Sequence, residues 1–229
     1  MLIERFHIEL EQAVDKRDNS AVPELGPEVK DYFLNEAQDR FIKLRYGKNN
    51  LYKAGFEEIQ KRTDDLKALV RTEIVPTAAV TYEDGVFKVD LDALPSTDLY
   101  MFYLRCRAEI SKESCPSKYV DVKLVTHDKL HRAMSDPFNK PEYGYPLAYF
   151  EDSDVLVMTD GTYTVPNVKL TYLKRPNQMN LGSYGGAKTE CELSEYTHKE
   201  IIQLAVDIII ENIESPRIQT TQQRMMTTE

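Results

Sequence analysis

Apolar residues recur at steps of three and four along three N-terminal segments, which is the spacing of one face of a helix. The first segment carries a narrow apolar stripe formed by Ile3, Phe6, Leu10 and Val14. Polar residues and a proline then interrupt the pattern at residues 19–26. The pattern therefore predicts a first helix that ends before this break.

Two further helices are predicted on either side of a short polar break at residues 48–53. The second helix begins at Pro27, which suits a first helical position, and ends at Gly47, which suits a C-terminal cap. Its expected apolar face consists of Val29, Phe33, Ala37, Phe41 and Leu44. The third helix is expected to carry Phe56, Ile59, Thr63, Leu66 and Val70 on one face, and Glu57 four residues before Lys61 on the other.

Between Ile74 and Lys174, apolar and polar residues alternate with a period of two, which predicts strands. Asp84-Gly85 and Asp160-Gly161 each stand between β-prone runs, the strongest short-range signal for a hairpin. Further strands are expected at residues 99–110, 118–125 and 167–173, so that the total is about six. A short helix, HDKLHRAM, is expected to stop before Asp136-Pro137.

The last predicted helix follows Leu193 and is the most apolar element of the chain. Thr197 and Glu200 fit a capping box, and Tyr196 with Ile201 fits a hydrophobic staple. Its polar residues form one stripe, made of Gln203, Asp207 and Glu211. A helix that is apolar on its other sides must be covered there, so we expect it to be the central helix.

Together these elements predict an α+β protein in which an α-helical bundle carries an inserted antiparallel β-domain. The expected parts are an N-terminal helical part (1–73), the β-rich domain (74–176), a loop with the C-terminal helix that completes the bundle (177–214), and an extended tail (215–229).

The amino-acid composition and charge argue against several classes of function. The 229-residue chain has 38 acidic and 29 basic residues, a net charge of −9, and no dense cluster of Lys and Arg. It is therefore a poor candidate for tight or sequence-specific nucleic-acid binding. No apolar run is long enough to span a membrane, the N-terminus does not fit a signal peptide, and three cysteines without CxxC spacing indicate neither disulfides nor zinc. We expect synthesis and folding in a cytoplasm, with the thiols reduced in small apolar spaces.

Candidate chemistry is sparse, and we expect no catalytic, cofactor-binding or metal-binding residues. His127 and His131 stand four apart, but Asp128 replaces the Glu of the zinc hydrolase motif and no third ligand follows. A metal-dependent hydrolase that uses this histidine pair is the alternative function, and a β-domain that binds a small molecule is a third. The acidic run 151–154 lacks a calcium-loop pattern, and the glycines of 178–188 lack a phosphate-loop pattern.

Three blocks of the sequence resemble the neck ring (head–tail connector) proteins of crAss-like bacteriophages. The first comprises EVKDYFLNEAQDRFIKLRYG and GFEEIQKRTDDLKALV, the second VTHDKLHRAMSDPFNKP with VLVMTDGTYTVPNVKLTYLKRP, and the third LSEYTHKEIIQLAVDIIIENIESPRIQ. They occur in the same order, and residues 76–117 lie outside them. The resemblance implies a structural protein of the virion neck, with no catalytic residue.

The resemblance further implies that the chain joins copies of itself in a closed ring, twelve-fold to match a portal. The portal protein and other neck or tail proteins are then its partners, the ring lines or supports the DNA channel, and neither a cofactor nor a membrane is involved. The tail is expected to dock on a partner through Pro216, Arg217, Ile218, Gln219, Met225 and Met226, because it is too polar to fold alone. A frayed terminus is the alternative for this segment.

Overall fold

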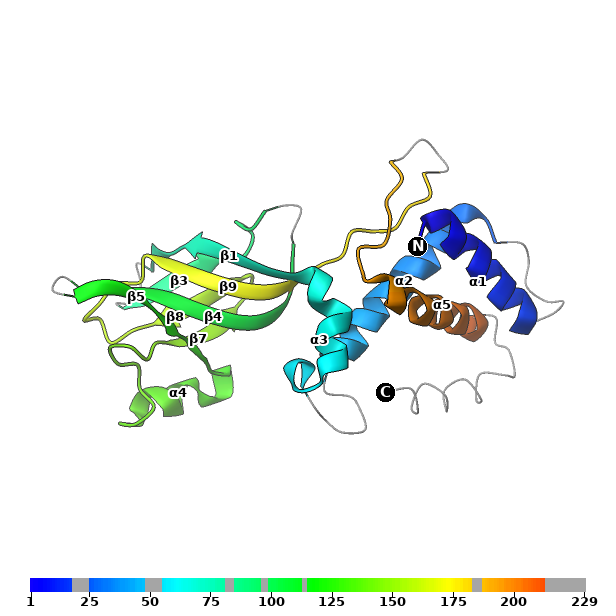
Figure 1. Cartoon of the computed structure of the whole chain (residues 1–229). Helices are drawn as coiled ribbons and strands as arrows, with labels where there is room; N and C mark the ends of the chain where they lie inside the picture. The colour runs from blue at the N-terminus through cyan, green and yellow to red at the C-terminus, as the bar shows by residue number, and fades with distance from the viewer. Residues whose placement is uncertain are drawn as a thin grey trace. The chain divides into compact units, whose positions relative to one another are not determined.

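The computed structural model divides the chain into two compact units (Figure 1). The first contains residues 1–69 and 176–229, and the second contains residues 70–175. The residues whose structure is described are 1–17, 25–47, 55–80, 85–95, 99–112, 115–182 and 187–212. Helices dominate the first unit and strands the second, so the predicted α+β class is confirmed.

Four α-helices and three 3-10 turns form the described part of the first unit. They are α1 (Ile3–Arg17), α2 (Pro27–Tyr46), η1 (Phe56–Glu58), α3 (Gln60–Leu66), η2 (Lys67–Leu69), η3 (Glu195–Thr197) and α5 (His198–Asn212). Helix α5 packs against both α1 and α2 (Figure 1). Segments from both ends of the sequence therefore share one core.

The apolar stripe predicted for α1 is confirmed. Its four members are almost completely buried: Ile3, Phe6, Leu10 and Val14. Phe6 contacts α5, where its ring centroid lies 4.9 Å from that of the His198 imidazole. The regular spacing is thus sufficient to place this helix.

Helix α2 has the predicted ends but a different buried face. Its buried residues are Lys30, Leu34, Ala37, Gln38, Phe41, Ile42 and Arg45, whereas Val29 is 43% exposed and Phe33 and Leu44 are half-buried. The expected face failed because it counted apolar residues alone. The buried polar side chains have partners that the pattern cannot indicate; for example, Lys30 Nζ lies 3.1 Å from a Glu11 carboxylate oxygen.

The third predicted helix is shorter than expected. Ile59 has an extended backbone and separates η1 from α3, and Val70 begins strand β1 instead of continuing the helix. Lys61 does not pair with Glu57 along one helix; its Nζ lies 3.3 Å from a carboxylate oxygen of Glu200 on α5. The helical pattern was thus extended too far at its C-terminal end.

The capping box and the staple predicted for α5 are wrong. The 3-10 turn η3 precedes the helix, and within it the Thr197 hydroxyl donates to the Ser194 carbonyl at 2.8 Å. Glu200 forms ion pairs with α2 and α3 instead of reaching back to the helix start. Tyr196, which was expected to cover Ile201, is 56% exposed.

The polar stripe of α5 is only partly in contact with solvent. Asp207 is 4% exposed, and its Oδ1 accepts a hydrogen bond from the Gln203 amide at 3.3 Å. Glu211 lies 3.5 Å from a guanidinium nitrogen of Arg40 on α2. The remaining surface is apolar and mostly buried, as the sequence indicates.

Nine strands in the described part of the second unit form two sheets. The four-stranded sheet has the order β1 (Val70–Pro76), β9 (Asn167–Lys174), β4 (Tyr100–Lys112), β5 (Cys115–Asp121). The five-stranded sheet has the order β2 (Ala78–Ala79), β3 (Val86–Asp90), β8 (Asp154–Met158), β7 (Leu147–Glu151), β6 (Lys123–Leu124). Neighbours are antiparallel except β6 and β7. The estimate of about six strands is too low, because β1 and β7 were not among the expected strands and the expected strand 118–125 divides into β5 and β6.

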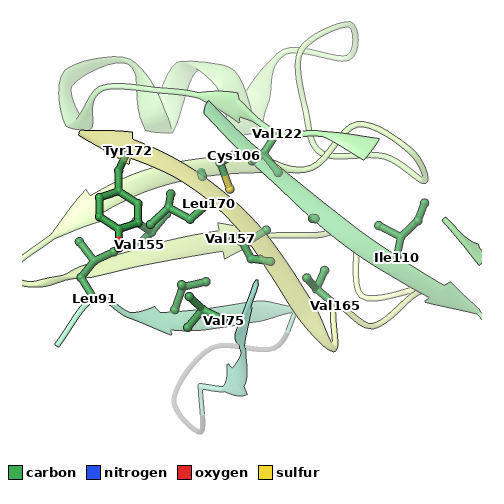
Figure 2. Packing of buried hydrophobic residues seen from close by; sticks show 14 of the residues in the cluster. Val75, Leu91, Cys106, Ile110, Val122, Val155, Val157, Val165, Leu170 and Tyr172 are labelled. Atoms are coloured by element: carbon green, nitrogen blue, oxygen red, sulfur yellow. The ribbon is translucent and has the colours of Figure 1, made fainter. Parts of the chain in front are cut away.

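The main core of this unit lies between the two sheets (Figure 2). Side chains from both sheets meet there, including Val75, Val157 and Leu170. Alternate residues of β8 point to its other face, where Leu156 joins a second apolar cluster. Leu130 of helix α4 (His127–Ser135) packs against that cluster, so α4 covers this face. Among the described helices, none is long and apolar enough to cross a bilayer.

One of the two predicted hairpins forms. Strands β2 and β3 are antiparallel and the turn between them ends at Gly85, whose φ of +78° favours glycine, while Asp84 lies outside the described residues. The second prediction is wrong, because residues 162–165 after Gly161 form no strand beside β8, and Thr164 instead makes an isolated antiparallel bridge with Ser111 of β4. The chain changes sheets after Gly161, and the hairpin instead joins β7 to β8 through Asp152, whose φ is +54°. An Asp-Gly pair specifies a turn but not the partner of the strand that follows.

Candidate functional site

The predicted tail interface cannot be placed. Helix α5 ends at Asn212, and residues 213–229 lie outside the described residues. This range contains all of the predicted partner-binding residues, namely Pro216, Arg217, Ile218, Gln219, Met225 and Met226. The docking function of the tail therefore stays a prediction.

Both histidines of the predicted pair lie on α4. His127 Nε2 lies within hydrogen-bonding distance of the Phe150 carbonyl oxygen, and the imidazole packs edge-on against Tyr149. His131 is exposed. No group of three His, Cys, Asp or Glu side chains suited to a metal occurs in the described residues. The pair attaches α4 to the sheet through His127 alone.

The three cysteines are free thiols in different surroundings. Burial raises the pKa of Cys106 to about 12 and that of Cys191 to about 11, so both are protonated at neutral pH. Cys115 is exposed, which contradicts the expectation that all the thiols fill apolar spaces. A protonated thiol is a poor nucleophile, so the two shielded cysteines do not form a catalytic centre.

A buried arginine links three helices of the first unit. Arg45 of α2 is 7% exposed, and its Nε lies 2.9 Å from a carboxylate oxygen of Asp65 on α3. Its guanidinium also pairs with Glu200 of α5 and lies over the Phe41 ring, 4.9 Å from the centroid. Sequence reasoning missed this cluster, because residues so far apart in the chain give no local signal.

Asp65 is the buried carboxylate of the arginine cluster, with a side chain that is only 1% exposed. Burial raises the pKa of Asp65, and the nearby Glu200 raises it further, while Arg45 and Lys61 oppose the shift. The arginine therefore compensates a carboxylate that water does not reach. The ion pairs of the cluster connect α2 with α3 and α5.

A hollow of about 420 Å³ opens between α1 and the start of α2. Its apolar lining comes from Ile8, Leu25, Pro27 and Leu181, and its polar lining includes Glu4, Glu11 and Lys30. One wall is fixed by Asp31, because one carboxylate oxygen lies 2.7 Å from His7 Nε2 and the other accepts the Leu181 amide at 3.1 Å. Residue 181 belongs to the glycine-containing loop, whose described part is tied to α2.

An exposed aromatic side chain, Phe138, projects from the second unit. Phe138 is 95% exposed, the largest exposure among the large apolar side chains of the described residues. It follows α4 in a turn that Asp136 closes, since the Phe138 amide donates to one carboxylate oxygen at 3.0 Å and the Asn139 amide group donates to the other. Lys123 of β6 in turn donates to Asn139 Oδ1 at 2.8 Å. The Asp-Pro pair predicted the end of α4, but nothing in the sequence ranks this Phe above the other exposed apolar residues.

The sequence similarity to known proteins covers both units. A family model described as phage tail ring protein 3/4 matches residues 1–223. The chain is 25% identical to Ring protein 4/5 of Bacteroides phage crAss001 over 228 residues, which covers 91% of this chain and 92% of that protein. It is 28% identical to Ring protein 3 of the same phage over 192 residues, which covers 79% of this chain and 83% of that protein. The family match includes residues 76–117, which lie outside the three resembling blocks.

Proposed function

Because the chain belongs to the phage tail ring protein 3/4 family, we propose that it forms a ring in the neck of a tailed virion and connects the portal to the tail. The match over residues 1–223 is the observation that carries this proposal. As a member of this family, the chain is a structural component of the virion and not an enzyme. The position in the neck and the contact with the portal are the proposed refinements.

The proposed ring is closed and contains twelve copies, so that it matches the symmetry of a portal. Its other partners are neighbouring neck or tail proteins. The net charge of −9 fits a ring that surrounds DNA without binding it tightly, because like charges weaken adhesion to the phosphate backbone. No sequence-specific contact with DNA is part of this function.

The tail is proposed as the segment that docks each subunit on its partner. In the sequence of the tail, Pro216 is a residue that disfavours a continuing helix, Arg217 offers a forked donor to a carboxylate, and Ile218, Met225 and Met226 offer apolar anchors. Truncation after Glu214 should leave a folded, soluble subunit that no longer joins the neck. Normal yields of infectious, DNA-filled particles from the truncated chain would show that the tail is not the docking segment.

The hydrolase alternative has no observation in its favour. Among the described residues, His127 and His131 lack a third ligand, and His127 already contacts a backbone carbonyl. The family to which the chain belongs is named for rings. We therefore do not retain a catalytic function for this pair.

The proposal is tested by a phage that lacks this chain and is complemented from a plasmid. Without the chain, we expect heads and tails that fail to join, visible by negative-stain electron microscopy, together with the loss of infectious particles. The matched control expresses the His127→Ala/His131→Ala variant, which should restore joined particles. Normal head–tail joining without any copy of the chain would refute the connector function.

A further inference from the structure

The four-stranded sheet of the second unit has an open edge at each end. Its outermost strands are β1 and β5, with β9 and β4 between them (Figure 1). In the described part of the chain, no strand pairs with the outer side of either. An edge strand presents unpaired N–H and C=O groups that readily pair with another strand, and closure of a sheet removes such edges. A ring of copies, as proposed above and on which the following rests, can provide a partner for both edges.

The backbone groups of β1 that point outward follow from its pairing with β9. The Thr77 amide, directly after β1, donates to the Pro166 carbonyl at 3.1 Å. Inward and outward groups alternate along an antiparallel strand. The N–H and C=O groups of Thr72 and Ile74 therefore point away from β9. Their side chains lie on the outer face of the sheet, where Ile74 is 58% exposed, whereas Val75 points into the core between the sheets.

The same alternation identifies the outward groups of β5. The Val122 amide, directly after β5, donates to the Cys106 carbonyl of β4 at 3.1 Å. The backbone groups of Tyr119 and Asp121 therefore point away from β4, and their side chains also lie on the outer face. The Tyr119 carbonyl receives a long contact of 3.4 Å from the Arg107 guanidinium and keeps a second lone pair for another donor.

The two edges can therefore pair with each other without turning the sheet over. Neighbouring strands from β1 to β5 are antiparallel, so β5 runs opposite to β1. On both edges, the outward groups belong to residues whose side chains lie on the outer face. Strand β1 of one copy thus continues the hydrogen-bond pattern beside β5 of another. A contact through opposite edges of one sheet is head-to-tail, as a closed ring of identical copies requires.

Two charged side chains at these edges are complementary. Glu73 of β1 and Lys118 of β5 each precede by two residues a side chain of the core between the sheets, so both lie on the inner face. Among the described residues, neither makes an ion pair. Lys118 Nζ lies 5.2 Å from the centroid of the Tyr143 ring, which leaves its charge uncompensated. Opposite charges placed directly across a strand pair stabilise it.

Pairing these charges also fixes a register that the prolines permit. With Glu73 opposite Lys118, residues 70–74 of one copy pair with residues 117–121 of the next. Pro76 and Pro116 then lie just beyond the same end of the paired stretch. Because proline has no N–H to donate, this is where pairing would stop.

We propose that β1 of one copy pairs antiparallel with β5 of the next, with Glu73 opposite Lys118, so that the four-stranded sheets join head-to-tail around the ring. The occupant of each edge is a second copy of this chain. The two edges match each other in strand direction, in outward backbone groups and in charge, whereas a different partner would need to match only one of them.

The test is disulfide trapping in particles of the phage that lacks the chain, complemented with the full-length Glu73→Cys/Lys118→Cys variant in a Cys115→Ser background. Opposite residues of adjacent antiparallel strands have Cα atoms about 4.5–5.5 Å apart, within reach of a disulfide. Within one chain the two positions lie three strand spacings apart, roughly 14 Å, which a disulfide cannot bridge. Mild oxidation should therefore produce a ladder of covalent oligomers on a non-reducing gel.

The matched control, Thr72→Cys/Lys118→Cys, moves one thiol by a single residue and thus to the other face of the sheet. We expect at least tenfold less cross-linked chain from this control. Equal cross-linking, a dimer from Lys118→Cys alone, or chain that stays uncross-linked in joined particles would overturn the proposal. The last result would leave the connector function intact, whereas joined particles without the chain would refute that function as well.

A proline substitution gives a second measurement that needs no cross-link. Thr72→Pro removes an outward N–H that the ladder with β9 does not use, so the purified chain should keep its circular dichroism spectrum. In the complemented phage it should reduce the yield of infectious particles at least tenfold. Thr72→Val also loses the hydroxyl contact with Thr171 but keeps the N–H, and it should support a normal yield. A normal yield from Thr72→Pro would contradict the strand pairing.

Discussion

Replacing the buried arginine by methionine should destabilise the first unit more than any exposed charge change. Arg45→Met keeps most of the apolar stem but leaves Asp65, which is 1% exposed, without its guanidinium 2.9 Å away. Breaking a buried ion pair from one side typically costs about 3–5 kcal/mol. That is a large part of the roughly 5–15 kcal/mol that stabilises a domain.

Two further variants distinguish the effect of leaving Asp65 buried without its partner from the effect of removing a positive charge. Lys61→Met removes an exposed partner of Glu200, so it should cost at most about 1 kcal/mol. The double variant Arg45→Met/Asp65→Leu removes both buried charges and should recover most of the loss. Because the chain has no tryptophan, urea unfolding is followed by the helical circular dichroism signal.

The free energy of unfolding that Arg45→Met removes, called the deficit below, should also depend on pH. Burial already raises the pKa of Asp65 in the folded chain, and the loss of Arg45 removes an opposing effect. A carboxyl group with a raised folded pKa binds protons more readily in the folded state, so stability falls as pH rises from the unfolded pKa to the folded one. The deficit should therefore be largest at neutral pH and shrink on acidification. If Arg45→Met costs no more than Lys61→Met at neutral pH, the cluster does not hold the helices together as described.

Three other substitutions test particular parts of the structure. Ile209→Asp, at a position 1% exposed, should abolish cooperative unfolding of the helices, whereas Lys199→Asp at an exposed position of α5 should melt almost as the original chain does. Gly85→Val should destabilise the β unit by more than about 1 kcal/mol, because φ is +78° and a Cβ would lie 3.2 Å from backbone atoms; an unchanged urea midpoint would contradict this. His127→Ala/His131→Ala should leave folding and particle assembly intact, and a bound metal lost with the variant would contradict the structural function of the pair.

Regular apolar spacing predicted the elements whose burial is one-sided. The stripe of α1 and the ends of α2 followed from local signals, namely period, proline and glycine. The buried face of α2 did not, because Gln38 and Arg45 are buried by pairing with distant groups. Hydropathy alone cannot score a polar side chain whose partner lies elsewhere in the sequence.

Strand partners were less predictable than strands. Strand β9 was expected, but its neighbours β1 and β4 are set by packing between sheets and not by the Asp160-Gly161 turn that precedes it. The candidate site shows the same limit. The exposure of Phe138 and the hollow at Ile8 depend on tertiary structure, whereas the tail interface rests on resemblance and stays a prediction.

The most direct test of the ring function is a cryo-electron microscopy reconstruction of the neck of purified particles from the phage that encodes this chain. We predict density for a closed ring of copies between the portal and the tail, each with a helical unit and a β-sandwich unit of the described fold. Absence of the chain from the particles, or its presence outside any ring, would contradict the account.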